Sequence, residues 1–189
     1  MTLHYLAYGS NLHPQRLIER VPSASLVGVV ELPGWTLNFH KRGADGSAKC
    51  DLVQVPQPSL CFAALYTLQA AHKPLLDEVE GLGSGYRLCW MPCRFQGRSY
   101  QAFAYRASAT HIEAELRPYR WYRDLVLDGA RFLGFAEHYV ASIRKVAVVE
   151  DPDRRRNAAH QALRARMAAY SGPVLRSTAD PTGGCDADC

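Results

Sequence analysis

The sequence has no uninterrupted apolar run long enough to cross a bilayer, so we expect no membrane span and no membrane partner. Its N-terminus has no basic segment followed by an apolar stretch, so no secretory signal is expected. It also has no Gly-x-x-x-x-Gly-Lys phosphate loop and no dinucleotide-binding glycine pattern. We therefore expect no nucleotide cofactor.

Cysteine and histidine occur in patterns that do not indicate a disulfide framework or a metal centre. The six cysteines are unevenly spaced, and Cys61 and Cys89 lie in apolar runs that are typical of small core residues. The Cys89–Cys93 pair would share one face of a strand, and the Cys185–Cys189 pair lies near the C-terminus. None of the seven histidines has metal-ligand spacing with another histidine or a cysteine. These patterns predict a reduced, cytoplasmic protein with no metal.

The net charge of +4 owes much to the C-terminal third, where Arg154–Arg156, Arg164 and Arg166 lie. The run is short and no aromatic residue is interleaved with it, which favours a solvated helix face over a nucleic-acid surface. We expect no nucleic-acid partner. A basic interaction module remains an alternative, and salt-dependent binding would reveal it.

The 189 residues, of which 48% are hydrophobic, are typical of one globular domain, expected over 1–170, with a flexible tail over 171–189. Expected strands are 3–8, 25–32, 35–40, 61–66, 86–95 and 99–105, with a hairpin turn at Gln96-Gly97. Expected helices are 13–20, a segment from 67 or 69 to Gly81, 116–128, 134–146 and 153–169. The polar stretch 41–51 is expected to be a loop. The pattern predicts an α+β protein, with a small mixed β-barrel or strongly curled sheet and helices around it.

The most informative segment is Tyr5-Leu6-Ala7-Tyr8-Gly9-Ser10-Asn11-Leu12, an apolar strand that ends in a turn of small residues. Such a turn leaves consecutive backbone N–H groups free to bind an anion or a developing oxyanion. Gly9 would permit backbone angles that other residues avoid and a close approach of ligand, while Ser10 and Asn11 supply polar side chains. An ordinary strand-to-helix turn is the alternative interpretation.

The second informative segment is Leu76-Asp77-Glu78-Val79-Glu80-Gly81. On a helix, Glu80 would border the apolar side formed by Leu76 and Val79, with Asp77 and Glu78 more exposed. A carboxylate at a helix C-terminus meets the negative end of the dipole, which is mildly unfavourable. Glu80 therefore has a specific role, or it caps a solvated helix end or pairs with a nearby arginine.

Together the two segments resemble those of the γ-glutamylcyclotransferase (AIG2-like) family. Tyr5–Leu12 looks like its substrate loop, and Leu76–Gly81 looks like the segment that carries its catalytic glutamate. The stretch Tyr122–Ala130 is similar to a helix that bears a substrate-contacting tyrosine, and the loop Lys41–Ser47 resembles the version in bacterial members. The resemblance covers roughly residues 3–147; the chain after 150 and the Gly83–Tyr86 stretch depart from the pattern.

The resemblance implies a fold, a reaction and a set of residues. The fold would be a small barrel of mixed strands with helices packed around it. The reaction would cleave a γ-glutamyl amide, with release of 5-oxoproline and a free amine or amino acid, and no metal or organic cofactor. The catalytic residue would be Glu80. The substrate-binding residues would be Tyr5, Leu6, Ala7, Tyr8, Gly9, Ser10, Asn11 and Tyr122.

The residues fit this chemistry, because the substrate's own α-amine attacks its γ-carbonyl and the enzyme needs no nucleophile of its own. A carboxylate such as Glu80 would take the proton of the amine and return it to the departing nitrogen. Three alternatives stay open: a γ-glutamylamine substrate, a γ-glutamyl-protected metabolite, and a non-catalytic binder of small molecules. The sequence leaves the oligomeric state and a role for Tyr86 undecided.

Overall fold

The computed structural model describes residues 1–56 and 58–172. Five strands form one mixed sheet in the order β2-β5-β1-β7-β6. Their bounds are Thr2–Ala7 (β1), Ser25–Pro33 (β2), Leu60–Gln69 (β5), Tyr86–Phe95 (β6) and Arg98–Ala107 (β7). Strand β1 lies at the centre, antiparallel to β5 and parallel to β7 through the Tyr5–Phe103 pair.

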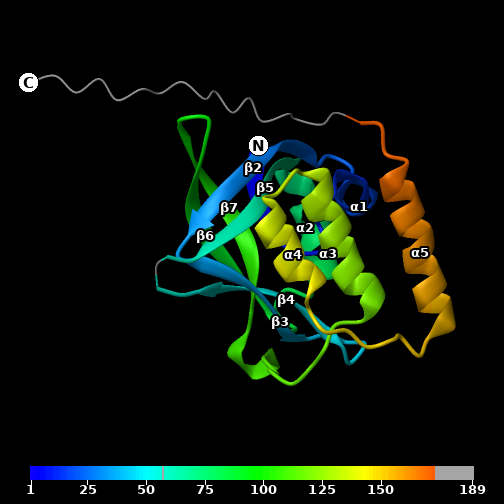
Figure 1. The fold of residues 1–189 in the computed structure, drawn as a ribbon. Helices are drawn as coiled ribbons and strands as arrows, with labels where there is room; N and C mark the ends of the chain where they lie inside the picture. Colours follow the sequence, from blue (N-terminus) through cyan, green and yellow to red (C-terminus); the bar gives the residue numbers. More distant parts are fainter. Residues whose placement is uncertain (57, 173–189) are drawn as a thin grey trace, which may run out of the picture.

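Two further strands, β3 (Trp35–Arg42) and β4 (Ala48–Gln54), form a separate antiparallel ribbon. The helices are α1 (Pro14–Arg20), α2 (Lys73–Glu80), α3 (Arg120–Phe132), α4 (Glu137–Arg144) and α5 (Arg154–Ala168). Short 3₁₀ helices cover Ala70–His72 and Ala109–His111. In Figure 1 the helices gather on one side of the strands, and α5 is the outermost, packed against α1 and α3. Strands dominate the first half and helices the second, which confirms the α+β prediction.

The expected closed barrel or strongly curled sheet is not what forms. The sheet is open, because the edge strands β2 and β6 share no hydrogen-bonded register. These two strands meet instead through a side chain: the ring of Phe95 fills the space that a side chain at Gly28 would need. A ring between the two backbones keeps them too far apart for ladder hydrogen bonds.

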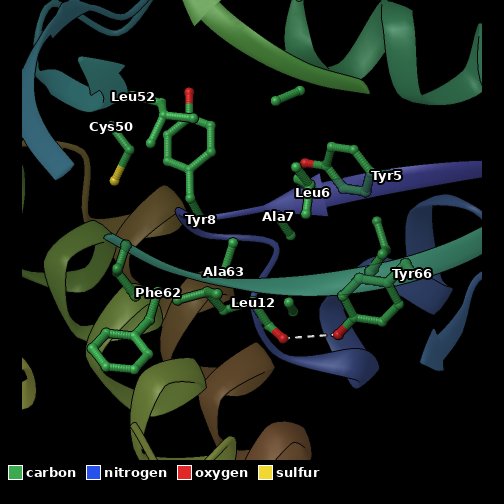
Figure 2. Close-up of a cluster of buried hydrophobic side chains, with 14 of the residues drawn as sticks. Tyr5, Leu6, Ala7, Tyr8, Leu12, Cys50, Leu52, Phe62, Ala63 and Tyr66 are labelled. Atoms are coloured by element: carbon green, nitrogen blue, oxygen red, sulfur yellow. Dashed lines mark hydrogen bonds between the residues drawn. The ribbon is translucent and has the colours of Figure 1, made fainter. Parts of the chain in front are cut away.

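The core lies between the central strands and the helices. Figure 2 shows Leu6 and Ala7 of β1 beside Ala63 and Tyr66 of β5, all of them buried. The Tyr66 hydroxyl donates to the Leu12 carbonyl at 2.8 Å. This bond fixes the end of the turn that follows β1 to the central sheet.

Several local predictions are confirmed. Helix α1 begins at Pro14, and the His13 side chain accepts a hydrogen bond from the Gln15 N–H. Helix α2 ends at Gly81, which caps it in the left-handed conformation at φ 67°. The hairpin of β6 and β7 turns at Gln96 and Gly97. Cys61 is buried in the core, whereas Cys89 is only half-buried and Trp90 beside it is exposed.

Other predictions were wrong. Residues 41–51 are mostly strand, since β3 continues to Arg42 and β4 begins at Ala48. The polar composition of this stretch led to the wrong prediction of a loop, because Asp45, Ser47 and Lys49 form hydrogen bonds with one another within the hairpin. The helix expected from 116 begins at Arg120, because the preceding segment is extended and Tyr119 bridges to Val149. Residues 173–189, most of the expected tail, lie outside the described part of the chain. Among the described helices, none is long and apolar enough to span a membrane.

Candidate functional site

Two adjacent hollows lie where the turn after β1, the end of α2 and helix α3 meet. The outer one is a cleft of about 670 Å³, and the inner one is a smaller hollow of about 20 Å³. Both hollows are lined by Ser10, Glu80, Tyr86 and Tyr122, so these four residues lie between them. Two elements far apart in sequence, the turn and the C-terminus of α2, thus share one site.

The turn Gly9–Leu12 presents free donors to this site. The Leu12 N–H bonds to the Gly9 carbonyl at 3.1 Å, but the N–H groups of Gly9, Ser10 and Asn11 donate to no described residue. Successive free N–H groups of this kind are a suitable cradle for a carboxylate or an oxyanion.

Gly9 is needed for a different reason than expected. Its φ is not positive, so it does not adopt the conformation that favours glycine. A Cβ atom at this position would instead lie 2.9 Å from Cys50 Cβ, which leaves no room for a side chain. Gly9 therefore lets the turn pack directly on β4.

Glu80, the last residue of α2, is held against the turn. Its Oε1 accepts from Asn11 Nδ2 at 2.7 Å and from Arg20 Nη1 at 3.3 Å. Arg20 Nη1 also donates to Asn11 Oδ1 at 2.8 Å, so the three side chains form a closed hydrogen-bonded group. The other carboxylate oxygen, Glu80 Oε2, accepts no hydrogen bond from a described residue. The Glu80 side chain lines both hollows. This oxygen is available to a ligand.

The surroundings of Glu80 are more polar than the sequence predicted. Leu76 is buried, but Val79 is exposed and forms no apolar wall beside the carboxylate. The Glu80 side chain is 17% exposed and paired with Arg20. The arginine partner considered as the alternative thus exists, and burial of Glu80 by itself does not argue for catalysis. Asp77 is only half-exposed, because its carboxylate accepts from Tyr105 and Lys73.

Buried tyrosines surround the inner hollow: Tyr5, Tyr8, Tyr86, Tyr105 and Tyr122. Tyr122 comes from α3, and its hydroxyl accepts the Cys50 N–H at 3.0 Å. Tyr86 donates its hydroxyl to the Cys50 carbonyl at 2.6 Å. Burial raises the pKa of both hydroxyls well above the ordinary value, so both stay protonated. The site thus keeps neutral hydroxyl groups close to the Glu80 carboxylate.

The outer cleft is rich in cations, namely Arg16, Arg20, Lys41, Arg42, Lys49 and Arg156. Four of them form ion pairs with carboxylates: Arg20 with Glu80, Arg42 with Glu113, Lys49 with Asp45, and Arg156 with Asp151. Arg16 and Lys41 belong to none of the ion pairs of the described chain, although they are only 6% and 7% exposed. The cleft is therefore suited to an anionic ligand.

His160 of α5 also lines the outer cleft. Its ring stacks on Trp121, with centroids 3.6 Å apart. Burial, reinforced by Arg16 and Lys49 nearby, lowers the pKa of His160 to about 4, so it is neutral at physiological pH. The described residues contain no group of three or more potential metal-ligating side chains.

Most of the residues predicted from sequence meet in this site. Glu80, Gly9, Ser10, Asn11 and Tyr122 line one or both hollows, and so do Tyr5 and Tyr8. Leu6 and Ala7 do not; both are fully buried in the core and line neither hollow. Tyr86, whose role the sequence left undecided, lines both.

Sequence reasoning missed the cations of the cleft. Arg16 and Arg20 are four residues apart on α1, a spacing that puts both on one helix face and could have pointed to them. Arg156 was taken as part of a solvated run, and Arg154 and Arg155 are indeed exposed. Arg156 itself is half-buried and enters the cleft, because Asp151 binds its guanidinium.

By sequence, the chain matches no protein-family model and no curated protein. Its structure does match solved structures. A protein described as "Gamma-glutamyl cyclotransferase" superposes with a TM-score of 0.75 at 20% identity, over 86% of this chain and 99% of that one. The uncharacterized human protein loc79017 gives 0.73 at 21% identity, over 85% and 98%. YkqA from Bacillus subtilis gives 0.66 at 20% identity, over 78% of this chain and 56% of that one. The chain therefore has the gamma-glutamyl cyclotransferase fold.

Proposed function

We propose that the chain is a cyclotransferase that cleaves a γ-glutamyl amide and releases 5-oxoproline and a free amine or amino acid. The observation that carries the proposal is the hydrogen bond from the Asn11 side chain to Glu80, which joins a carboxylate to a turn whose three N–H groups have no partner in the described chain. The shared fold supports it. The cationic cleft supports a small, anionic γ-glutamyl substrate.

In the proposed reaction the substrate's α-amine gives a proton to Glu80 Oε2 and its nitrogen attacks the γ-carbonyl carbon. The ring closes, and the carbonyl oxygen becomes an oxyanion that the N–H groups of Gly9, Ser10 and Asn11 stabilise. The oxyanion then collapses, the bond to the leaving nitrogen breaks, and Glu80 returns the proton to that nitrogen. Both reacting groups belong to one molecule, so the site mainly has to hold the folded conformer. No cofactor takes part.

The buried tyrosines have a positioning role in this proposal. Tyr122 accepts from the Cys50 N–H and Tyr86 donates to the Cys50 carbonyl, which fixes the part of the inner hollow that Cys50 forms. Tyr5 accepts from Asn11 Nδ2 at 3.1 Å and so orients the same amide that holds Glu80. Side chains fixed in this way hold a catalytic group within the narrow range of geometry that proton transfer needs.

The test is release of 5-oxoproline from a panel of γ-glutamyl amino acids and γ-glutamylamines. We expect Glu80→Gln to lower kcat by about 10²–10⁴-fold, the usual contribution of a general acid–base group. Its dissociation constant for substrate should stay within about threefold, since the amide keeps the size of the carboxyl. Glu137→Gln, a change at an exposed residue of α4, is the matched control and should keep wild-type kcat.

A non-catalytic binder is the second candidate, and the Arg20–Glu80 ion pair favours it because the pair gives Glu80 Oε1 a structural partner. A folded protein that binds γ-glutamyl compounds but releases no 5-oxoproline would establish the binder. Wild-type turnover in Glu80→Gln would remove Glu80 from the mechanism.

A further inference from the structure

Arg16 is a buried guanidinium without a counter-ion in the described chain. It lies on α1 and is 6% exposed, and its Nε has no hydrogen-bond partner. Burial lowers the pKa of Arg16 to about 9, and the neighbouring Arg20 adds to this effect. A buried charge is costly unless it is paired. The position of Arg16 at the wall of the cleft indicates that its partner comes from a ligand.

Four of the other five cations that line the cleft already have carboxylate partners, and the fifth, Lys41, lies over the Tyr86 ring at 4.5 Å. Lys49 lies 2.7 Å from Asp45, and Arg156 donates two hydrogen bonds to Asp151 at 2.6 and 2.7 Å. Both nevertheless line the same cleft, together with Trp121 of α3. An anion beside Arg16 would therefore lie in a positive field while it competes with no carboxylate for the Arg16 guanidinium.

Arg16 belongs to the outer cleft and not to the inner hollow. Glu80 and the turn Gly9–Asn11 line the inner hollow, whose volume of about 20 Å³ has room for one water-sized group, such as the reacting carbonyl oxygen. Arg16, Lys49 and Arg156 line only the outer cleft. A substrate whose reacting carbonyl lies beside Glu80 therefore has room for its leaving group only in the outer cleft, which Arg16 lines.

We propose that Arg16 forms an anion subsite that binds a carboxylate on the leaving group and so determines specificity. The inference rests on the proposed function. It assigns as substrates the γ-glutamyl compounds whose leaving group is an amino acid or peptide with a free carboxylate, and it disfavours γ-glutamylamines. The guanidinium offers the paired donors that a carboxylate binds best.

The test compares two ligands that differ only in this carboxylate, γ-glutamyl-alanine and γ-glutamyl-ethylamine. Calorimetry with the Glu80→Gln protein measures binding without turnover. We expect γ-glutamyl-alanine to bind at least about tenfold more tightly, as for a charge-assisted pair in a partly desolvated site. In the Glu80→Gln/Arg16→Met protein this preference should fall to about twofold or less, through loss of affinity for γ-glutamyl-alanine alone.

Two further variants separate a carboxylate subsite from a structural role. Arg16→Lys keeps the charge and should recover part of the preference. Arg155→Met removes an exposed arginine from α5 and should leave the preference as it is.

Three outcomes would overturn the subsite: equal affinity for the two ligands in the Glu80→Gln protein, equal loss for both in the Arg16→Met protein, or a preference that depends on Lys41→Met instead. The first needs no Arg16 variant, so the test holds even if that variant fails to fold. Failure of the proposed function looks different. If binding shows an Arg16-dependent preference but the wild type releases no 5-oxoproline, the subsite proposal stands and the proposed reaction is wrong.

Discussion

The side-chain amide of Asn11 donates to Glu80 Oε1 at 2.7 Å and so joins the turn after β1 to the last residue of α2. The same amide nitrogen lies 3.1 Å from the Tyr5 hydroxyl, and the amide oxygen accepts from Arg20. Asn11 itself is 3% exposed, whereas Arg20 and Glu80 each keep part of their surface in contact with water. One short side chain thus orients the carboxylate and both of its neighbours.

We expect Asn11→Ala to lower both activity and stability. Loss of the bond that orients Glu80 should reduce kcat by roughly 10–100-fold, as for other residues that position a catalytic group. Loss of the partners of Tyr5 and Arg20 should reduce the free energy of unfolding by about 1–3 kcal/mol. Urea unfolding and 5-oxoproline release measure the two effects. Gln15→Ala, which removes an exposed bond to Glu19 on α1, should change neither; wild-type kcat in Asn11→Ala would contradict the positioning role.

Gly9→Ala should destabilise the protein because the new Cβ would lie 2.9 Å from Cys50 Cβ and 3.2 Å from its Sγ. Overpacking of this kind costs about 1–3 kcal/mol. A double-mutant cycle with Cys50→Gly tests the cause, since removal of the Cys50 side chain should relieve the clash. Strictly additive effects of the two substitutions would show that the clash is not the reason for glycine at this position.

Arg16→Met should raise the stability of the unliganded protein. The substitution removes an unpaired buried charge while it keeps the length of an apolar stem, and such changes stabilise by about 1–3 kcal/mol. The thermal midpoint should rise. Arg155→Met is the matched control. Because Arg155 is exposed, this substitution should change the free energy of unfolding by no more than about 0.5 kcal/mol. A fall in the midpoint of Arg16→Met would mean that the guanidinium has a structural partner.

Acid should destabilise the protein partly through His160. Its folded pKa of about 4 lies below the ordinary value, because of burial first and of Arg16, Lys49 and Arg20 second, while Asp151 opposes them. The unfolded chain therefore binds the proton first as the pH falls. The contribution of the neutral His160 to the free energy of unfolding is complete above about pH 6.5 and is lost progressively toward pH 4. After allowance for solvent screening, the loss at pH 5 is about 1 kcal/mol.

The variant His160→Phe isolates this effect, because phenylalanine can still stack on Trp121 and does not titrate. Urea unfolding at pH 7.5 and pH 5 should show a smaller loss of stability in the variant than in the wild type. Equal losses in the two proteins would assign the acid sensitivity to other groups, such as His13, whose pKa burial also lowers to about 4.

Local sequence patterns predicted most of the helices and strands, together with two parts of the site: the turn after β1 and the C-terminus of α2. The apolar run of β1, Pro14 at the start of α1 and Gly81 at the end of α2 each have a backbone cause that neighbouring residues reveal. The pairing of the turn with Glu80 came from a family resemblance, and the hydrogen bond from Asn11 is its structural counterpart. Polar residues caused the main local error, since a run such as 41–51 can be a hairpin when a residue of its turn, here Asp45, pairs with Lys49 on the strand that follows.

Backbone preference and hydrophobic period act over a few residues, so local patterns predicted most of the strands and helices, though not β4, and the turn of small residues after β1. The tertiary structure decided the rest. It brought Arg16, Lys49 and Arg156 from three distant elements to one cleft, gave all but Arg16 of these a carboxylate partner, and made glycine necessary at position 9 through Cys50 of β4. These relationships depend on which strand pairs with which and on how helices pack, and a long-range contact leaves no local trace in the residues that make it.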